Sequence, residues 1–170
     1  AFVGTEKSDI YYSLDALIPS SLLSKETWTT GDTLDGKEGN DILNIQTGIA
    51  MAGTGPDLNL TSIETVNVKT ANAITNLDGS KWDGTNTLNV TQATAATLVA
   101  AATTDVNVSG ITTGAVSVNG GKNVNVNDDA TASTITIGAI TGATGTVTVK
   151  DAAQNGAIKV DGGTDVTISA

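Results

Sequence analysis

From about residue 41 onward, short runs alternate apolar and polar residues, and Gly, Asn, Asp, Thr and Ala separate one run from the next. A period of two is typical of β-strands with one buried face. Successive runs begin about 8 to 12 residues apart. Their apolar members are Leu58/Leu60, Val66/Val68, Leu77, Leu88/Val90, Leu98, Val106/Val108, Val116/Val118, Val124/Val126, Ile135/Ile137, Val147/Val149, Ile158/Val160 and Val166/Ile168. The pattern predicts an all-β protein made of many short strands.

Alternate runs also match one another along a longer period of about 18 to 23 residues. The matching positions are Val66, Leu88, Val106, Val124, Val147 and Val166. This period predicts a parallel β-solenoid (a β-helix or β-roll) with two strands per coil, and a sandwich of antiparallel hairpins is the alternative. We expect a short N-terminal cap or linker over residues 1–30 with room for one helix at 14–24, turns at 31–57, and solenoid coils over 58–170.

Two segments of the chain repeat one another closely. Residues 114–124 read GAVSVNGGKNV and residues 156–166 read GAIKVDGGTDV. In both, a Gly-Gly pair separates two strand-like runs, and glycine adopts positive φ without steric cost. The repeat predicts the same tight corner in two coils.

The polar residue between the two apolar members of alternate runs should point away from the core. These residues are Asn67, Asn89, Asn107, Asn125, Thr148 and Thr167. They predict an outward column in which stacked side chains form hydrogen bonds. A polar lattice contact or a glycan-facing side is the functional alternative for this column.

The amino-acid composition excludes several classes of partner and of catalytic chemistry. The chain has 8 Lys+Arg against 18 Asp+Glu, a formal net charge of −10, and no Cys or His. The negative charge argues against nucleic acid and anionic membranes as partners. The missing residue types exclude disulfides, thiolate nucleophiles, Cys/His zinc sites and imidazole catalysis. No apolar stretch approaches the roughly 20 residues that span a bilayer, so we expect no membrane insertion.

Residues 31–44, GDTLDGKEGNDILN, carry the sharpest motif. Gly36, Gly39, Asp41 and Leu43 fit the glycine- and aspartate-rich nonapeptide of calcium-binding β-rolls, and Lys37 replaces its second glycine. Asp32 lies nine residues before Asp41, so we expect the two turns to stack and share a Ca²⁺ ion. Carboxylates and backbone carbonyls suit this hard cation. The candidate metal ligands are Asp32, Asp35, Gly36, Gly39 and Asp41, and a metal-free Gly/Asp turn is the alternative.

These motifs give the first part of the chain a family resemblance. FVGT at 2–5 with SDIY at 8–11, GDTLDG at 31–36 with GNDILN at 39–44, and LTSIETVNV at 60–68 resemble the repeats of RTX-class proteobacterial surface-layer (S-layer) proteins of the Campylobacter and Caulobacter type. The resemblance implies a secreted, Ca²⁺-dependent β-solenoid that assembles into a layer on the bacterial cell surface.

We therefore expect a structural protein without enzymatic activity. Its main partner should be further copies of itself, in a layer or an extracellular fibre, with cell-surface polysaccharide as a further candidate partner. An adhesin or phage-fibre module that binds carbohydrate is the alternative. A solenoid polysaccharide lyase or hydrolase would need a cleft with basic and aromatic residues, and only 3% of the chain is aromatic.

Overall fold

The computed structural model describes residues 1–14, 32–48, 58–128, 134–152 and 156–170. Within these ranges the chain forms β-strands and no helix. The helix expected at 14–24 lies outside the described residues apart from Leu14, which ends strand β2. Every strand pair is parallel, so the fold is the predicted β-solenoid and not a sandwich of hairpins.

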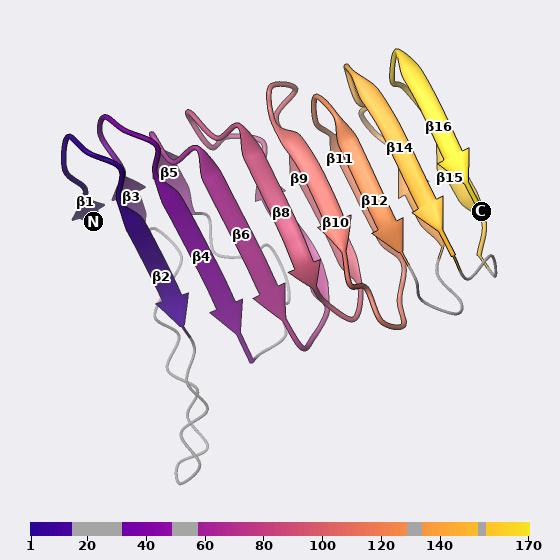
Figure 1. The fold of residues 1–170 in the computed structure, drawn as a ribbon, viewed down its shortest axis with the longest axis horizontal. Coiled ribbons are helices and arrows are strands. Elements are labelled where there is room, and N and C mark those ends of the chain that lie inside the picture. The colour runs from indigo at the N-terminus through magenta and orange to yellow at the C-terminus, as the bar shows by residue number, and fades with distance from the viewer. Residues whose placement is uncertain (15–31, 49–57, 129–133, 153–155) are drawn as a thin grey trace, which may run out of the picture.

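The largest sheet of the described chain takes one strand from each coil, and Figure 1 shows these strands side by side along the long axis. They are β2 (Ile10–Leu14), β4 (Ile42–Thr47), β6 (Thr65–Thr70), β8 (Thr87–Gln92), β10 (Asp105–Ser109), β12 (Val124–Asp128), β14 (Thr146–Asp151) and β16 (Asp165–Ser169). We call this the long sheet.

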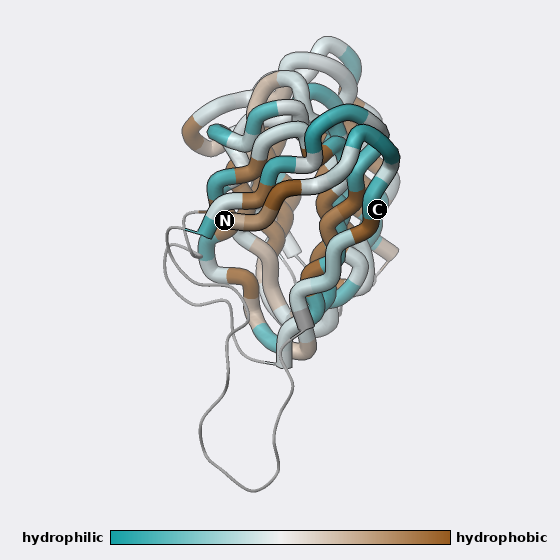
Figure 2. Tube along the Cα trace, turned by 90° about the vertical axis from the view of Figure 1, so that its left-hand side faces the viewer, coloured by the Kyte–Doolittle hydropathy of each residue, from teal (hydrophilic) through white to brown (hydrophobic). Residues whose placement is uncertain are grey.

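Two smaller sheets contain the other strand of each coil. One consists of β1 (Phe2–Val3), β3 (Thr33–Asp35) and β5 (Asn59–Thr61). The second consists of β7 (Ile74–Gly79), β9 (Ala96–Ala100), β11 (Val116–Gly120), β13 (Ile135–Ile137) and β15 (Ile158–Val160). Figure 2 looks along the axis from the N-terminal end and shows hydrophobic positions on the inner sides of the two walls.

Strand register places equivalent residues in columns that run along the axis. One inward column contains Tyr11, Leu43, Val66, Leu88, Val106, Val124, Val147 and Val166. The predicted longer period is therefore confirmed. Its members from Leu43 to Val147 are buried in one hydrophobic core. The same stacking begins before residue 58, because β4 pairs with both β2 and β6.

The two Gly-Gly corners also form as predicted. Gly120 and Gly121 have φ of 76° and 90°, and Gly162 and Gly163 have φ of 89° and 85°. The first pair joins β11 to β12 and the second joins β15 to β16. These corners bring the chain from the second small sheet to the long sheet within a few residues.

Candidate functional site

Three carboxylates stack at the corner where the chain enters the first strands of the long sheet. Asp9, Asp41 and Glu64 precede β2, β4 and β6. The Asp41 carboxylate accepts a hydrogen bond from the Asp9 backbone N–H at 2.7 Å, and Glu64 accepts one from the Asp41 N–H at 2.6 Å. The side chains of Asp41 and Glu64 thus each bind the backbone of the preceding coil. We call these three residues the acidic corner.

Asp41 is the most enclosed member of the acidic corner. Its side chain is fully buried, and its second carboxylate oxygen, Oδ2, has no hydrogen-bond partner among the described residues. This oxygen lies against Gly36, where a Cβ atom would meet both Asp41 Oδ2 and the Ser62 carbonyl oxygen. Glycine at position 36 is therefore required for the close approach of the Asp41 carboxylate. An unpartnered buried carboxylate oxygen is costly and calls for a ligand.

Asp9, one coil earlier, has partners of its own. Its Oδ2 accepts hydrogen bonds from the Thr5 backbone N–H at 2.7 Å and from the Thr5 hydroxyl at 2.9 Å. The Thr5 backbone hydrogen bond, followed by that of the hydroxyl, lowers the pKa of Asp9. The Asp9 carboxylate is thus held within its own turn by Thr5.

The turn after β3 holds the other residues of the motif. Lys37 adopts φ of 75°, a left-handed conformation that favours glycine, in the position where the nonapeptide has its second glycine. Lys37 Nζ lies 2.7 Å from Asp35 Oδ2, and the hydrogen bond to Lys37 lowers the pKa of Asp35. Gly39, with φ of 133°, lies against the backbone of Lys7 and Ser8. Asp35 is thus paired with Lys37.

The structure does not bring Asp32 and Asp41 together. Asp32 precedes β3 and Asp41 follows the turn after β3, so they lie at opposite ends of that strand within one coil. The stacking expected from their nine-residue separation is wrong, because a coil contains two strands and the chain returns to the same side only after both. The residues in register beside Asp41 are Asp9 and Glu64.

A Ca²⁺ ion needs six to eight oxygen ligands. Among the described residues, no group of three or more Asp, Glu, His or Cys side chains is arranged to hold a metal ion. Asp41 Oδ2 and the Ser62 carbonyl are oxygens that a cation could take as ligands. Two oxygens are fewer than Ca²⁺ needs, so the described residues of the acidic corner do not form a complete calcium site.

A column of asparagines runs across the outer face of the long sheet. Asn67 Nδ2 donates to Asn44 Oδ1 at 2.9 Å, Asn89 to Asn67 at 2.8 Å, and Asn107 to Asn89 at 2.9 Å. Register continues the column to Asn125, Thr148 and Thr167 as predicted, and back to Tyr12. Sequence reasoning missed Asn44 and Tyr12, although both occupy the outward place between two inward residues.

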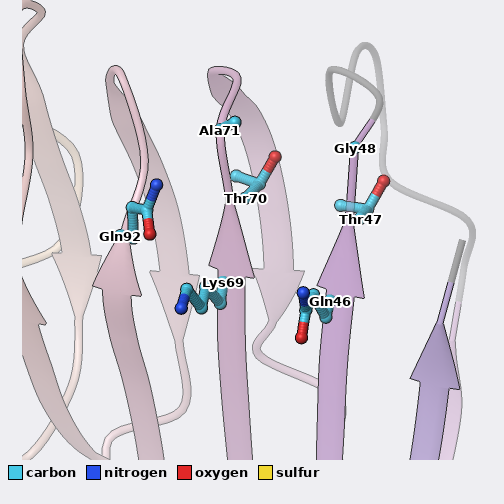
Figure 3. Close-up of a pocket in the computed structure, with 7 residues that line it drawn as sticks. All are labelled: Gln46, Thr47, Gly48, Lys69, Thr70, Ala71 and Gln92. Atoms are coloured by element: carbon cyan, nitrogen blue, oxygen red, sulfur yellow. The ribbon is translucent and has the colours of Figure 1, made fainter. Parts of the chain in front are cut away.

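A second outward row lies beside this column. Gln46, Lys69 and Gln92 stand on β4, β6 and β8, and Figure 3 shows them on three neighbouring strands. They line a hollow of about 240 Å³ together with Thr47, Gly48, Thr70 and Ala71. A neighbouring hollow of about 410 Å³ is lined by Tyr12, Asn44, Ile45, Gln46, Asn67, Val68, Lys69 and Thr91. Gln46 and Lys69 border both, and we call the two hollows together the amide groove.

Comparison with known proteins gives no relative for this fold or these sites. No family model matches the chain, and neither a curated protein nor a solved structure does so. In the described ranges, no helix has the length and apolar character needed to cross a membrane.

Proposed function

We propose that this chain is a structural element of a bacterial surface layer or extracellular fibre, extended by head-to-tail stacking of copies. The observation that carries the proposal is that β2 and β16, the outermost strands of the long sheet among the described residues, each pair with a strand on one side only and bear exposed apolar side chains. An open strand edge offers unpaired N–H and C=O groups to a further strand.

The C-terminal end exposes the last members of two inward columns. Val166 is 46% exposed and Ile168 is 47% exposed, whereas Val147 and Val149, their partners on β14, are buried. Thr167 lies between them on the outward side of β16. A further coil on β16 would bury both aliphatic side chains, and this burial favours association.

The N-terminal end offers a matching surface. A hollow of about 360 Å³ is lined by Phe2, Ile10, Tyr11, Tyr12, Ser13, Leu34 and Leu43. Tyr11 and Ser13 head the columns that end at Val166 and Ile168. If β16 of one copy pairs in parallel with β2 of the next, both columns continue across the junction. The two contact surfaces differ, and a heterologous contact that does not close generates a filament.

Sedimentation velocity and electron microscopy over a concentration series test this assembly. We expect the 170-residue chain to form rods that grow along the solenoid axis. Ile168→Lys, which places a charge in the stacking surface, should leave monomers. Thr167→Lys is the matched control, because it adds the same charge to the outward side of the same strand. A parent chain that stays monomeric throughout, or an Ile168→Lys variant that assembles normally, would refute the stacking model.

The proposal includes Ca²⁺ and an extracellular location, as the surface-layer resemblance implies. Asp41 Oδ2 supports a cation at the acidic corner, where it would offset the stacked negative charges of Asp9, Asp41 and Glu64. Extracellular calcium modules bind at about 10⁻⁴ to 10⁻³ M.

Isothermal calorimetry should detect binding at millimolar Ca²⁺ and its loss in Asp41→Ala. Asp161→Ala, which removes a carboxylate from an exposed turn, should bind as the parent does. If the heat of calcium binding is unchanged in Asp41→Ala, or is absent from the parent chain, Ca²⁺ is removed from the proposal. The stacking model is then tested separately by the assembly experiment.

A further inference from the structure

The outer face of the long sheet has an unusual charge distribution over β4, β6 and β8. Its outward side chains are amides, hydroxyls, one isoleucine and one lysine, and none is a carboxylate. This is notable in a chain with 18 Asp+Glu and a net charge of −10. A face without carboxylates can bind a ligand through hydrogen bonds without desolvating anionic groups.

We propose that the amide groove binds a neutral polysaccharide, which lies across the strands with Tyr12 as a stacking platform. This binding is distinct from end-to-end stacking and uses the outer face of the long sheet, although Tyr12 also borders the N-terminal stacking hollow. The ligand class follows from three features of the groove: an exposed aromatic ring, rows of oriented amides, and hollows between those rows.

Tyr12 supplies the apolar contact. Its side chain is 67% exposed on β2, and it lines the larger hollow of the amide groove with Asn44 and Asn67. A tyrosine ring has a flat apolar face and a polar hydroxyl. The C–H face of a sugar ring can lie on such a ring while the sugar hydroxyls reach the neighbouring amides. Binding sites typically combine apolar or aromatic walls with a few placed polar groups.

The asparagine column supplies donors that are already oriented. Each of its hydrogen bonds runs in the same direction, from Nδ2 of one coil to Oδ1 of the preceding coil. An amide nitrogen has two N–H groups and an amide oxygen has two lone pairs. Each bond of the column uses one N–H and one lone pair, so Asn67 and Asn89 keep hydrogen-bonding capacity toward solvent. Because neighbouring strands lie about 4.8 Å apart, this capacity repeats regularly, as a polymer with repeating hydroxyls requires.

The second row completes the groove. Gln46, Lys69 and Gln92 place two longer amides and one ammonium beside the column, across hollows of about 240 and 410 Å³. Hydrogen bonding within the column explains the asparagines as sheet-stabilising residues. It explains neither the exposed ring of Tyr12 nor the row of longer side chains, and both fit a ligand groove. The net charge of −10 disfavours an anionic polymer, since Lys69 is the one cation in the lining residues of the two hollows.

Native affinity electrophoresis tests the proposal. Gels would contain dextran, galactomannan or arabinoxylan as neutral probes and alginate as an anionic probe, with the protein too dilute to stack. We expect retardation in at least one neutral gel and none in alginate. Tyr12→Ala and Lys69→Ala should each weaken that retardation about five- to tenfold.

Lys150→Ala is the matched control. Lys150 is exposed at the fifth position of β14, as Lys69 is at the fifth position of β6, but it lies outside the amide groove. The Lys150→Ala variant should be retarded as strongly as the parent chain, and circular dichroism should show the same strand content in all variants. Three outcomes would overturn the proposal: no retardation in any neutral gel, retardation in alginate alone, or equal retardation of Tyr12→Ala, Lys69→Ala and Lys150→Ala.

Discussion

Replacing Asn89 by alanine removes two hydrogen bonds at the centre of the asparagine column. Asn89 donates to Asn67 Oδ1 at 2.8 Å and accepts from Asn107 Nδ2 at 2.9 Å. A side-chain hydrogen bond contributes about 0.5 to 1.5 kcal/mol net, and this column is half-buried, so water can replace part of the loss. We expect Asn89→Ala to lower the free energy of local opening around β8 by about 1 to 2 kcal/mol.

Native-state hydrogen exchange is the appropriate assay, because solenoids gain stability from neighbouring coils and open locally. A loss of 1 to 2 kcal/mol corresponds to about 5- to 30-fold faster exchange over β6, β8 and β10. Asn125→Ala is the control. Asn125 stands in the same column and also lies between two aliphatic residues, so its replacement changes β-propensity similarly. It is exposed, however, and takes no part in the three asparagine hydrogen bonds. Equal acceleration in the two variants would refute the argument that the bonds stabilise the sheet.

Three further predictions concern the turns. Gly120→Ala should destabilise the protein severely and lower its melting temperature, because the residue has φ of 76° and a Cβ would collide with the Ala100 carbonyl oxygen. Lys37→Gly should raise the stability measured in urea by about 1 kcal/mol, since relief of the left-handed conformation outweighs loss of an exposed ion pair; an unchanged midpoint would contradict this. The pKa of Asp9 is lowered in the folded chain, so it contributes stability that is complete above the ordinary value of 3.8 and is lost as pH falls through the lower folded value. Thr5→Val should shift the pKa of Asp9 upward, and NMR titration would measure that shift.

The sequence predicted the fold because two periods coincide. The period of two places Val106 and Val108 inward, and the longer period repeats that pair in register with Val124 and Val126. A sandwich of antiparallel hairpins does not require a second period in register. The presence of that period therefore favoured parallel coils stacked on one another. The corner at Gly120 could also be predicted, because the Gly-Gly pair occurs twice in the sequence. Both copies have positive φ in the structure.

The candidate site was harder to predict, because it depends on which residues are one coil apart. Near the N-terminus the coils differ in length: the hydrogen bond between Asp9 and Asp41 spans 32 residues, and that between Asp41 and Glu64 spans 23. A nonapeptide motif gives the separation of two strands within a coil, not that of two coils. Asp32 was therefore expected on the wrong side of the coil. Glu64 lies within the stretch at 60–68 that carries the family resemblance, but nothing in that stretch marked it as a partner of Asp41.

The two proposals use surfaces that share Tyr12 but otherwise differ, and this arrangement has a consequence for binding strength. Stacking through Ile168 and Tyr11 would extend the columns along the axis and leave the outer face of the long sheet uncovered, so every copy in a filament would keep its own amide groove. A long polysaccharide could then bind several grooves at once, and the second binding event would be intramolecular. We expect assembled rods to be retained on a neutral polysaccharide at least tenfold more strongly than Ile168→Lys monomers, while short oligosaccharides bind both equally. Equal retention of rods and monomers on the long polymer would show that the grooves of a filament do not act together.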